Sequence, residues 1–256
     1  MLPVVLDGLY YFVADDDIHG DELWVSDGTA SGTQMVGDLY PGGFGSDIVE
    51  IIPFKGDIYA NAWIDGNEFE LVKIDVSEGA AEIVKDIYPG DSGYPQFLYV
   101  FGDLLLFLAE DGGHGYELWK SDGTTSGTKL IKDIYPGTSQ GAQFFLGRMA
   151  VDDIFYFSAD DGVNGIELWK TDGTEVGTKM VSDLYPGSNG SEPYRFGEFK
   201  DRLYFSADDG SGYKPWYTFI SKKIHPQAYF WNPVALLRNQ KMTMMGKKKF
   251  RTTNDS

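Results

Sequence analysis

The sequence contains no cysteine among its 256 residues. Disulfide bonds, thiolate metal sites and cysteine nucleophiles are therefore excluded. The chain also lacks an apolar run of about 18 residues, so no transmembrane helix is expected. Its first residues do not show a basic segment followed by an apolar one, so no signal peptide is expected either.

Positive charge is scarce over most of the chain. Residues 217–256 hold eight Lys and Arg and one acid, whereas the whole chain has a formal net charge of −18, which leaves −25 on residues 1–216. A surface this acidic repels phosphate backbones and anionic lipids. Nucleic acid is therefore not expected as a partner.

Glycine and aromatic residues are abundant, with 32 glycines and 15% Phe, Trp and Tyr. Glycine and short polar side chains favour tight turns, whereas aromatic and β-branched side chains favour strands. This composition predicts an all-β protein.

One block recurs along the chain at nearly constant spacing. It opens with Glu-Leu-Trp-x-x-Asp-Gly-Thr, continues with Gly-Thr, and closes with Asp-(Leu/Ile)-Tyr-Pro-Gly. The closing prolines are at positions 41, 89, 136 and 186, so the gaps are 48, 47 and 50 residues. A fixed period of this size with strand-like segments inside it is typical of a propeller blade. The full opening block stands at Glu22–Thr29, Glu117–Thr124 and Glu167–Thr174.

The fourth repeat illustrates the predicted blade. Its apolar and aromatic segments predict four strands, at 144–146, 154–159, 166–171 and 179–184. Proline at 186 ends the last strand, because proline cannot extend a hydrogen-bonded ladder. The whole pattern predicts a β-propeller, or an open arc of one, with about four complete four-stranded antiparallel blades and a partial fifth. The predicted blades are 2–47, 48–93, 94–141, 142–191 and 192–216.

Two parts of the chain depart from the repeat. In the second repeat Glu70-Leu71-Val72 replaces Glu-Leu-Trp, and the non-repeated residues Trp63, Asp65 and Glu68 form no obvious acid–base set. Residues 217–256 are basic, rich in Lys and Met, and show no period. We interpret them as a disordered end or as a terminus foreign to the repeat. A short helix at a membrane surface is the alternative.

The recurring blocks resemble the ELWxxDGT repeat family of large bacterial secreted and surface proteins, whose repeats look like blades of TolB-type β-propellers. The resemblance covers about residues 1–216, with three full motifs, one eroded and one truncated. It implies an extracellular or cell-surface module that is part of a longer repeat protein. It implies no particular substrate.

Acidic residues gather in the loops that would share one face of the propeller. Carboxylates and loop carbonyls suit calcium, which takes about six to eight oxygen ligands. The alternative is that these residues form turns and keep the surface soluble. The candidate calcium ligands are Asp15, Asp16, Asp38, Asp111, Asp133, Asp160, Asp161, Asp183, Asp208 and Asp209.

Aromatic residues also recur once per repeat. The tyrosines before the closing prolines are candidates for binding a protein or glycan ligand on the acidic face: Tyr40, Tyr88, Tyr135 and Tyr185. The tryptophans of the opening block are expected to pack between neighbouring sheets, with carbohydrate stacking as the alternative: Trp24, Trp119, Trp169 and Trp216. The aspartates of the Asp-Gly-Thr segments are interpreted as turn formers: Asp27, Asp122 and Asp172.

Catalysis has little support in the sequence. His19 and His114 occupy matching positions, but Asn164 stands there in the fourth repeat, which favours a turn over a general base. We therefore predict a non-enzymatic extracellular binding or adhesion module, assisted by calcium. The alternatives are a hydrolase with a carboxylate pair at the central channel, and a structural spacer that binds no ligand.

Overall fold

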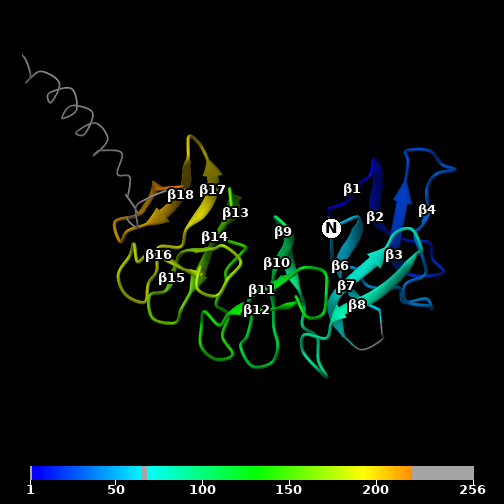
Figure 1. The fold of residues 1–256 in the computed structure, drawn as a ribbon, viewed down its shortest axis with the longest axis horizontal. Coiled ribbons are helices and arrows are strands. Elements are labelled where there is room, and N and C mark those ends of the chain that lie inside the picture. The colour runs from blue at the N-terminus through cyan, green and yellow to red at the C-terminus, as the bar shows by residue number, and fades with distance from the viewer. Residues whose placement is uncertain (1, 65–67, 221–256) are drawn as a thin grey trace, which may run out of the picture.

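The computed structural model describes residues 2–64 and 68–220, and these form nineteen strands and no helix (Figure 1). The strands make five antiparallel sheets, each built from consecutive segments of chain. Four sheets have four strands and the fifth has three. The first three sheets are β1 (Val4–Leu6), β2 (Leu9–Asp15), β3 (Asp21–Ser26), β4 (Gln34–Met35); β5 (Glu50–Phe54), β6 (Asp57–Trp63), β7 (Phe69–Asp75), β8 (Ala80–Lys85); and β9 (Gln96–Phe101), β10 (Leu104–Ala109), β11 (Glu117–Ser121), β12 (Lys129–Lys132). The last two are β13 (Arg148–Val151), β14 (Ile154–Asp160), β15 (Ile166–Thr171), β16 (Lys179–Ser182); and β17 (Tyr194–Glu198), β18 (Arg202–Asp208), β19 (Tyr213–Phe219).

Short turns join the first two strands of each sheet. Asp7-Gly8 connects β1 to β2 and Lys55-Gly56 connects β5 to β6, with positive φ at all four residues. Two central residues with positive φ make the turn type whose twist matches that of the flanking strands. The sequence therefore encodes these hairpins locally.

The five sheets follow one another in an open arc, with the first and last at opposite ends (Figure 1). The first strands of the sheets lie on the concave side, where β5 neighbours both β1 and β9, and β13 neighbours β17. One buried apolar cluster fills each junction between neighbouring sheets, as at Leu23 and Val72, Leu71 and Trp119, or Phe144 and Trp169. Burial between sheets is therefore what holds the arc together.

The all-β prediction and the antiparallel four-stranded sheets are confirmed. In the fourth repeat one strand assignment is wrong, and another extends two residues too far. Residues 144–146 form a turn, closed by the Leu146 N–H donating to the Gln143 carbonyl, and the first strand is β13. Phe144 is buried in an inter-sheet cluster, so its apolar character reflects packing and not a strand. The last strand, β16, ends at Ser182, before Asp183.

The predicted tail lies outside the described residues from 221 onward, as does Asp65. Strand β19 continues past the repeat boundary at 216 to Phe219. Among the residues that the structure describes, no helix has the length and apolar character needed to cross a membrane.

Candidate functional site

The Asp-Gly-Thr segments form one turn that is repeated in three sheets. In the first, Asp27 Oδ1 accepts hydrogen bonds from both the N–H and the hydroxyl of Thr29, at 2.9 and 2.7 Å. A Cβ at Gly32 would lie 2.0 Å from Asp27 Oδ1, so the turn closes only around glycine. The same bonds recur at Asp122 and Asp172, which confirms their interpretation as turn formers.

The acidic loops also use their carboxylates internally. Asp16 Oδ1 accepts from the N–H groups of Ile18 and His19, at 2.9 and 2.8 Å. Other predicted calcium ligands accept backbone N–H groups within their own loops in the same way, namely Asp15, Asp111, Asp160, Asp161, Asp208 and Asp209. The remaining three lie close to buried glutamates: Asp38, Asp133 and Asp183. Calcium binding at these ten aspartates stays a prediction.

The two histidines complete these loops. The Nδ1 atom of His19 lies 2.7 Å from Asp16 Oδ2, and that of His114 lies 2.9 Å from Asp111 Oδ2. In the fourth repeat the Asn164 side-chain amide donates to Asp161 Oδ2 at 2.8 Å. Because an amide replaces the imidazole without changing the bond, this position forms a turn, as expected.

The tyrosines of the closing blocks are half-buried. Tyr40 stacks on Trp63 with ring centroids 5.7 Å apart, and the Tyr88 ring lies against Gly112 in the acidic loop of the following sheet. The same packing on the next loop recurs at Tyr135 and Tyr185. These rings therefore connect neighbouring repeats, and their role in ligand binding stays a prediction.

Three of the four tryptophans are buried between sheets. Trp119, Trp169 and Trp216 each belong to an apolar junction, whereas Trp24, in the first sheet, is half-buried. In the second sheet Val72 takes the position and is fully buried against the first sheet. The prediction that this position packs between sheets is confirmed.

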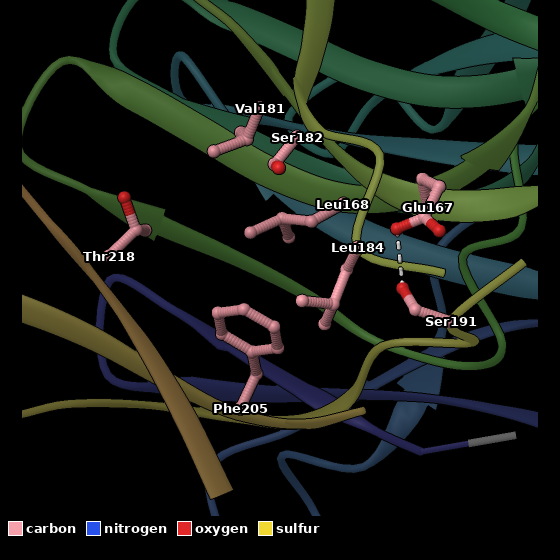
Figure 2. A pocket seen from close by; sticks show the side chains of 8 residues that line it. All are labelled: Glu167, Leu168, Val181, Ser182, Leu184, Ser191, Phe205 and Thr218. Carbon is pink, nitrogen blue, oxygen red and sulfur yellow. Dashed lines mark hydrogen bonds between the residues drawn. The ribbon is translucent and has the colours of Figure 1, made fainter. Parts of the chain in front are cut away.

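The glutamate that opens each block ties its strand to the closing loop. Glu167 Oε1 accepts the N–H of Tyr185 at 3.0 Å, and Oε2 accepts the hydroxyl of Ser191 at 2.5 Å (Figure 2). Glu22 makes the same two bonds with Tyr40 and Ser46. The hollow beside Glu167 in Figure 2 has a volume of only about 10 Å³, too small for a ligand.

Glycine replaces this serine in the second and third sheets. Gly93 and Gly141 adjoin Glu70 and Glu117, and in both glutamates Oε2 has no hydrogen-bond partner. Burial raises the pKa of Glu70 to about 7 and that of Glu117 to about 8. Burial also raises the pKa of Glu22 and Glu167, but there the serine hydroxyl bond works against the shift.

The largest of the pockets described for the chain lies on the concave side of the arc. It has a volume of about 750 Å³ and is open to solvent. Its walls come mainly from β1, β5 and β9, the first strands of three successive sheets. Glu50, Asn61, Tyr94, Gln96 and Phe97 supply its polar and aromatic groups. We refer to it as the axial pocket.

Glu50 and Asn61 are two neighbouring acceptors in the wall of the axial pocket. They are cross-strand partners in β5 and β6, so their side chains point to one face about 5 Å apart. Asn61 Oδ1 is buried and has no hydrogen-bond partner. Burial raises the pKa of Glu50, while the N–H groups of Leu98 and Phe97 and the charge of Arg148 partly offset this shift. The pocket is therefore lined by one partly buried carboxylate and by an amide whose buried oxygen has no hydrogen-bond partner.

An arginine from the fourth sheet lies beside Phe97 in the wall of the axial pocket. The Arg148 guanidinium lies 5.0 Å from the Phe97 ring centroid and donates to the Phe144 carbonyl at 3.2 Å. Phe97 has φ of 58° at an irregularity in the β9–β10 pairing, which is the local bend that brings its N–H toward Glu50. A charged, partly desolvated wall results.

One residue of this pocket, Asn61, departs from the repeat and could have indicated the site from the sequence. Asn61 pairs with the motif leucine Leu71, and Leu108 and Ser158 hold the corresponding positions opposite Leu118 and Leu168. A polar amide at this position breaks the repeat. A unique site requires such a departure, because residues that recur in every sheet serve the fold.

No protein-family model matches the chain, and no curated protein matches it. Two solved structures resemble most of it with TM-scores above 0.5. One is from a study of two prolyl endopeptidases (TM-score 0.54, 16% identity, 90% of this chain and 36% of that chain). The other is a puromycin-hydrolyzing peptidase of Mycobacterium tuberculosis (0.53, 11%, 90% and 38%). TolB from Acinetobacter baumannii scores lower (0.47, 17%, 87% and 53%), too low to carry an argument.

These similarities correct the function predicted from the sequence. We expected a non-enzymatic binding or adhesion module, but these two structures are of peptidases, which agrees better with the hydrolase alternative. The chain spans about a third of the length of the peptidases it resembles. At these identities the similarity shows the fold. The recurring residues do not indicate the activity, because they form turns, inter-sheet junctions and strand-to-loop hydrogen bonds.

Proposed function

We propose that this chain is a propeller portion of a peptidase-type hydrolase and that its axial pocket holds the amino end of a peptide substrate. The observation that carries the proposal is the Glu50–Asn61 pair, two acceptors on one face of the pocket. A carboxylate and an unpaired amide oxygen are satisfied by a ligand that brings donors. A protonated amine followed by peptide N–H groups provides them.

The fold similarity supports the hydrolase class. The chain matches about a third of two peptidases along 90% of its own length. The residues that line the axial pocket include one carboxylate and no serine or histidine. A carboxylate-pair mechanism needs two acids flanking the bond. We therefore assign the hydrolytic groups to another part of a longer protein or to a partner, and the pocket to substrate binding.

The resemblance to ELWxxDGT repeats supports the other parts of this proposal. It favours a propeller built from these sheets and a place outside the cell, within a longer repeat protein. The open arc leaves the first and last sheets free to be joined by further sheets (Figure 1).

A titration with paired peptides tests the substrate assignment. Calorimetry with Ala-Ala-Phe amide at pH 7 should show saturable binding to the full chain. Its N-acetylated form should bind at least about tenfold more weakly, a difference of about 1.4 kcal/mol. Glu50→Gln should lose the preference for the free amine, whereas Glu198→Gln, which alters an exposed acid on β17, should keep it.

Three outcomes would count against the proposal. Equal binding of both peptides would remove the role of Glu50, and the absence of saturable binding would favour the structural spacer. Hydrolysis of the peptide by the chain alone would show that the hydrolytic groups lie within these 256 residues. That result would overturn the assignment of chemistry to another part of the protein.

A further inference from the structure

The second sheet brings three carboxylates together. Glu68 immediately precedes β7, Glu70 lies within β7, and Asp86 immediately follows β8. One carboxylate oxygen from each lies within 4.8 Å of those from the other two. Among the described residues, no other three acidic or histidine side chains approach one another so closely.

Only the second repeat contains the third carboxylate. The pair Glu70 and Asp86 recurs as Glu22 and Asp38, Glu117 and Asp133, and Glu167 and Asp183. Two residues before the glutamate, however, the other repeats have glycine, at Gly20, Gly115 and Gly165. Glu68 thus places a third carboxylate beside the repeated pair, where the three could bind one ligand together.

Glu70 leaves an acceptor unused within this group. Its side chain is fully buried, and Oε1 accepts the N–H groups of Gly93 and Tyr88 at 3.0 and 3.3 Å. Its Oε2 has no hydrogen-bond partner, because Gly93 stands where Ser46 and Ser191 donate a hydroxyl in the first and fourth sheets. A buried acceptor left without a donor is costly.

The three carboxylates form no ion pair with a described residue. A bound cation would compensate both the desolvated carboxylate and the mutual repulsion.

We propose that Glu68, Glu70 and Asp86 bind a divalent cation, and that calcium fits them best. Calcium takes oxygen ligands at about 2.3–2.6 Å, so two oxygens on opposite sides of one ion lie up to about 5 Å apart. Magnesium is usually held by one or two carboxylates and keeps several of its waters, whereas three carboxylates meet here. The site joins the start of β7 to the loop after β8 and is independent of the proposed hydrolase function.

Calcium titration of the full chain tests the site. Calorimetry should show one calcium ion bound per chain, and the thermal midpoint should rise with calcium and more than with equal magnesium. Glu68→Gln should weaken binding by roughly tenfold or more, since affinity depends on the number of charged ligands. Glu68→Gly restores the residue of the other repeats and should have the same effect. Both variants should melt cooperatively without calcium, which shows that they fold.

A control variant separates this site from the acidic loops. Asp161→Asn changes a carboxylate of the fourth repeat and should leave calcium binding unchanged. Loss of binding in Asp161→Asn with retention in Glu68→Gln would place calcium in the loops and overturn the proposal. No saturable calcium binding would overturn it too.

Discussion

At the scale of single residues, the repeated glutamate shows how one neighbouring residue changes the hydrogen bonding of a buried carboxylate. Glu22 and Glu167 receive a serine hydroxyl, whereas Glu70 and Glu117 face glycine and keep one oxygen unpaired. Desolvation disfavours the charged form of each. The presence or absence of one serine hydroxyl therefore divides the four glutamates into two pairs.

The pKa of Glu117 predicts a pH-dependent stability. Its carboxyl is raised to about 8 by burial and by the neighbouring Asp133, so the folded state holds the proton more tightly than the unfolded state. Its contribution is complete below about pH 4.5 and is lost as the pH rises through 8. Glu117→Gln should therefore flatten the free energy of unfolding between pH 5 and pH 8.5, by up to roughly 5 kcal/mol at about 1.4 kcal/mol per pKa unit.

Urea unfolding at several pH values measures this effect. Glu167→Gln is the matched control, because it removes the same carboxylate where Ser191 already donates to it. It should lower stability across the whole range and change the pH slope less. An unchanged slope in Glu117→Gln would contradict the assignment of the raised pKa to this residue.

At the scale of elements, the third strand of the fourth sheet, β15, has two roles. Its Glu167 binds the closing loop of its own repeat, and its Trp169 fills the junction with the preceding sheet. The wrong assignment of residues 144–146 has the same origin. Phe144 is apolar because it fills a junction, and local sequence does not distinguish a buried turn from a short strand.

The tryptophans predict unequal effects of one substitution. Trp169→Ala should cost about 3–5 kcal/mol, because it empties the junction between the third and fourth sheets. Trp24→Ala should cost clearly less, since Trp24 is half-buried in the first sheet of the arc. Chemical denaturation of the two variants measures the difference, and equal losses would show that another surface covers Trp24 in solution.

At the scale of the whole molecule, burial distinguishes the middle of the arc from its ends. Strands β6, β10 and β14 are buried along nearly their whole length, so packing covers both faces. Strand β18 alternates between buried and half-buried residues, and β2 is mostly half-buried. The end sheets therefore pack on one face only.

Hydrogen exchange tests this difference. Amides of β10 and β14 should be protected most, and those of β2 and β18 should exchange faster, because nearest-neighbour packing stabilises stacked repeats. Mass spectrometry of peptic fragments resolves these strands. Equal protection at the ends and in the middle would mean that the arc is closed in solution, by a second copy or by residues beyond those described.

The sequence by itself determined the repeat, the antiparallel sheets and the turns, because these depend on short-range features such as Asp-Gly-Thr and Asp7-Gly8. It did not determine the sites. Glu50 and Asn61 become partners only through strand register, and Glu68, Glu70 and Asp86 meet only where β7 lies against β8. A repeat describes what its members share, whereas each of these sites depends on a residue in which the second repeat differs, namely Asn61 or Glu68.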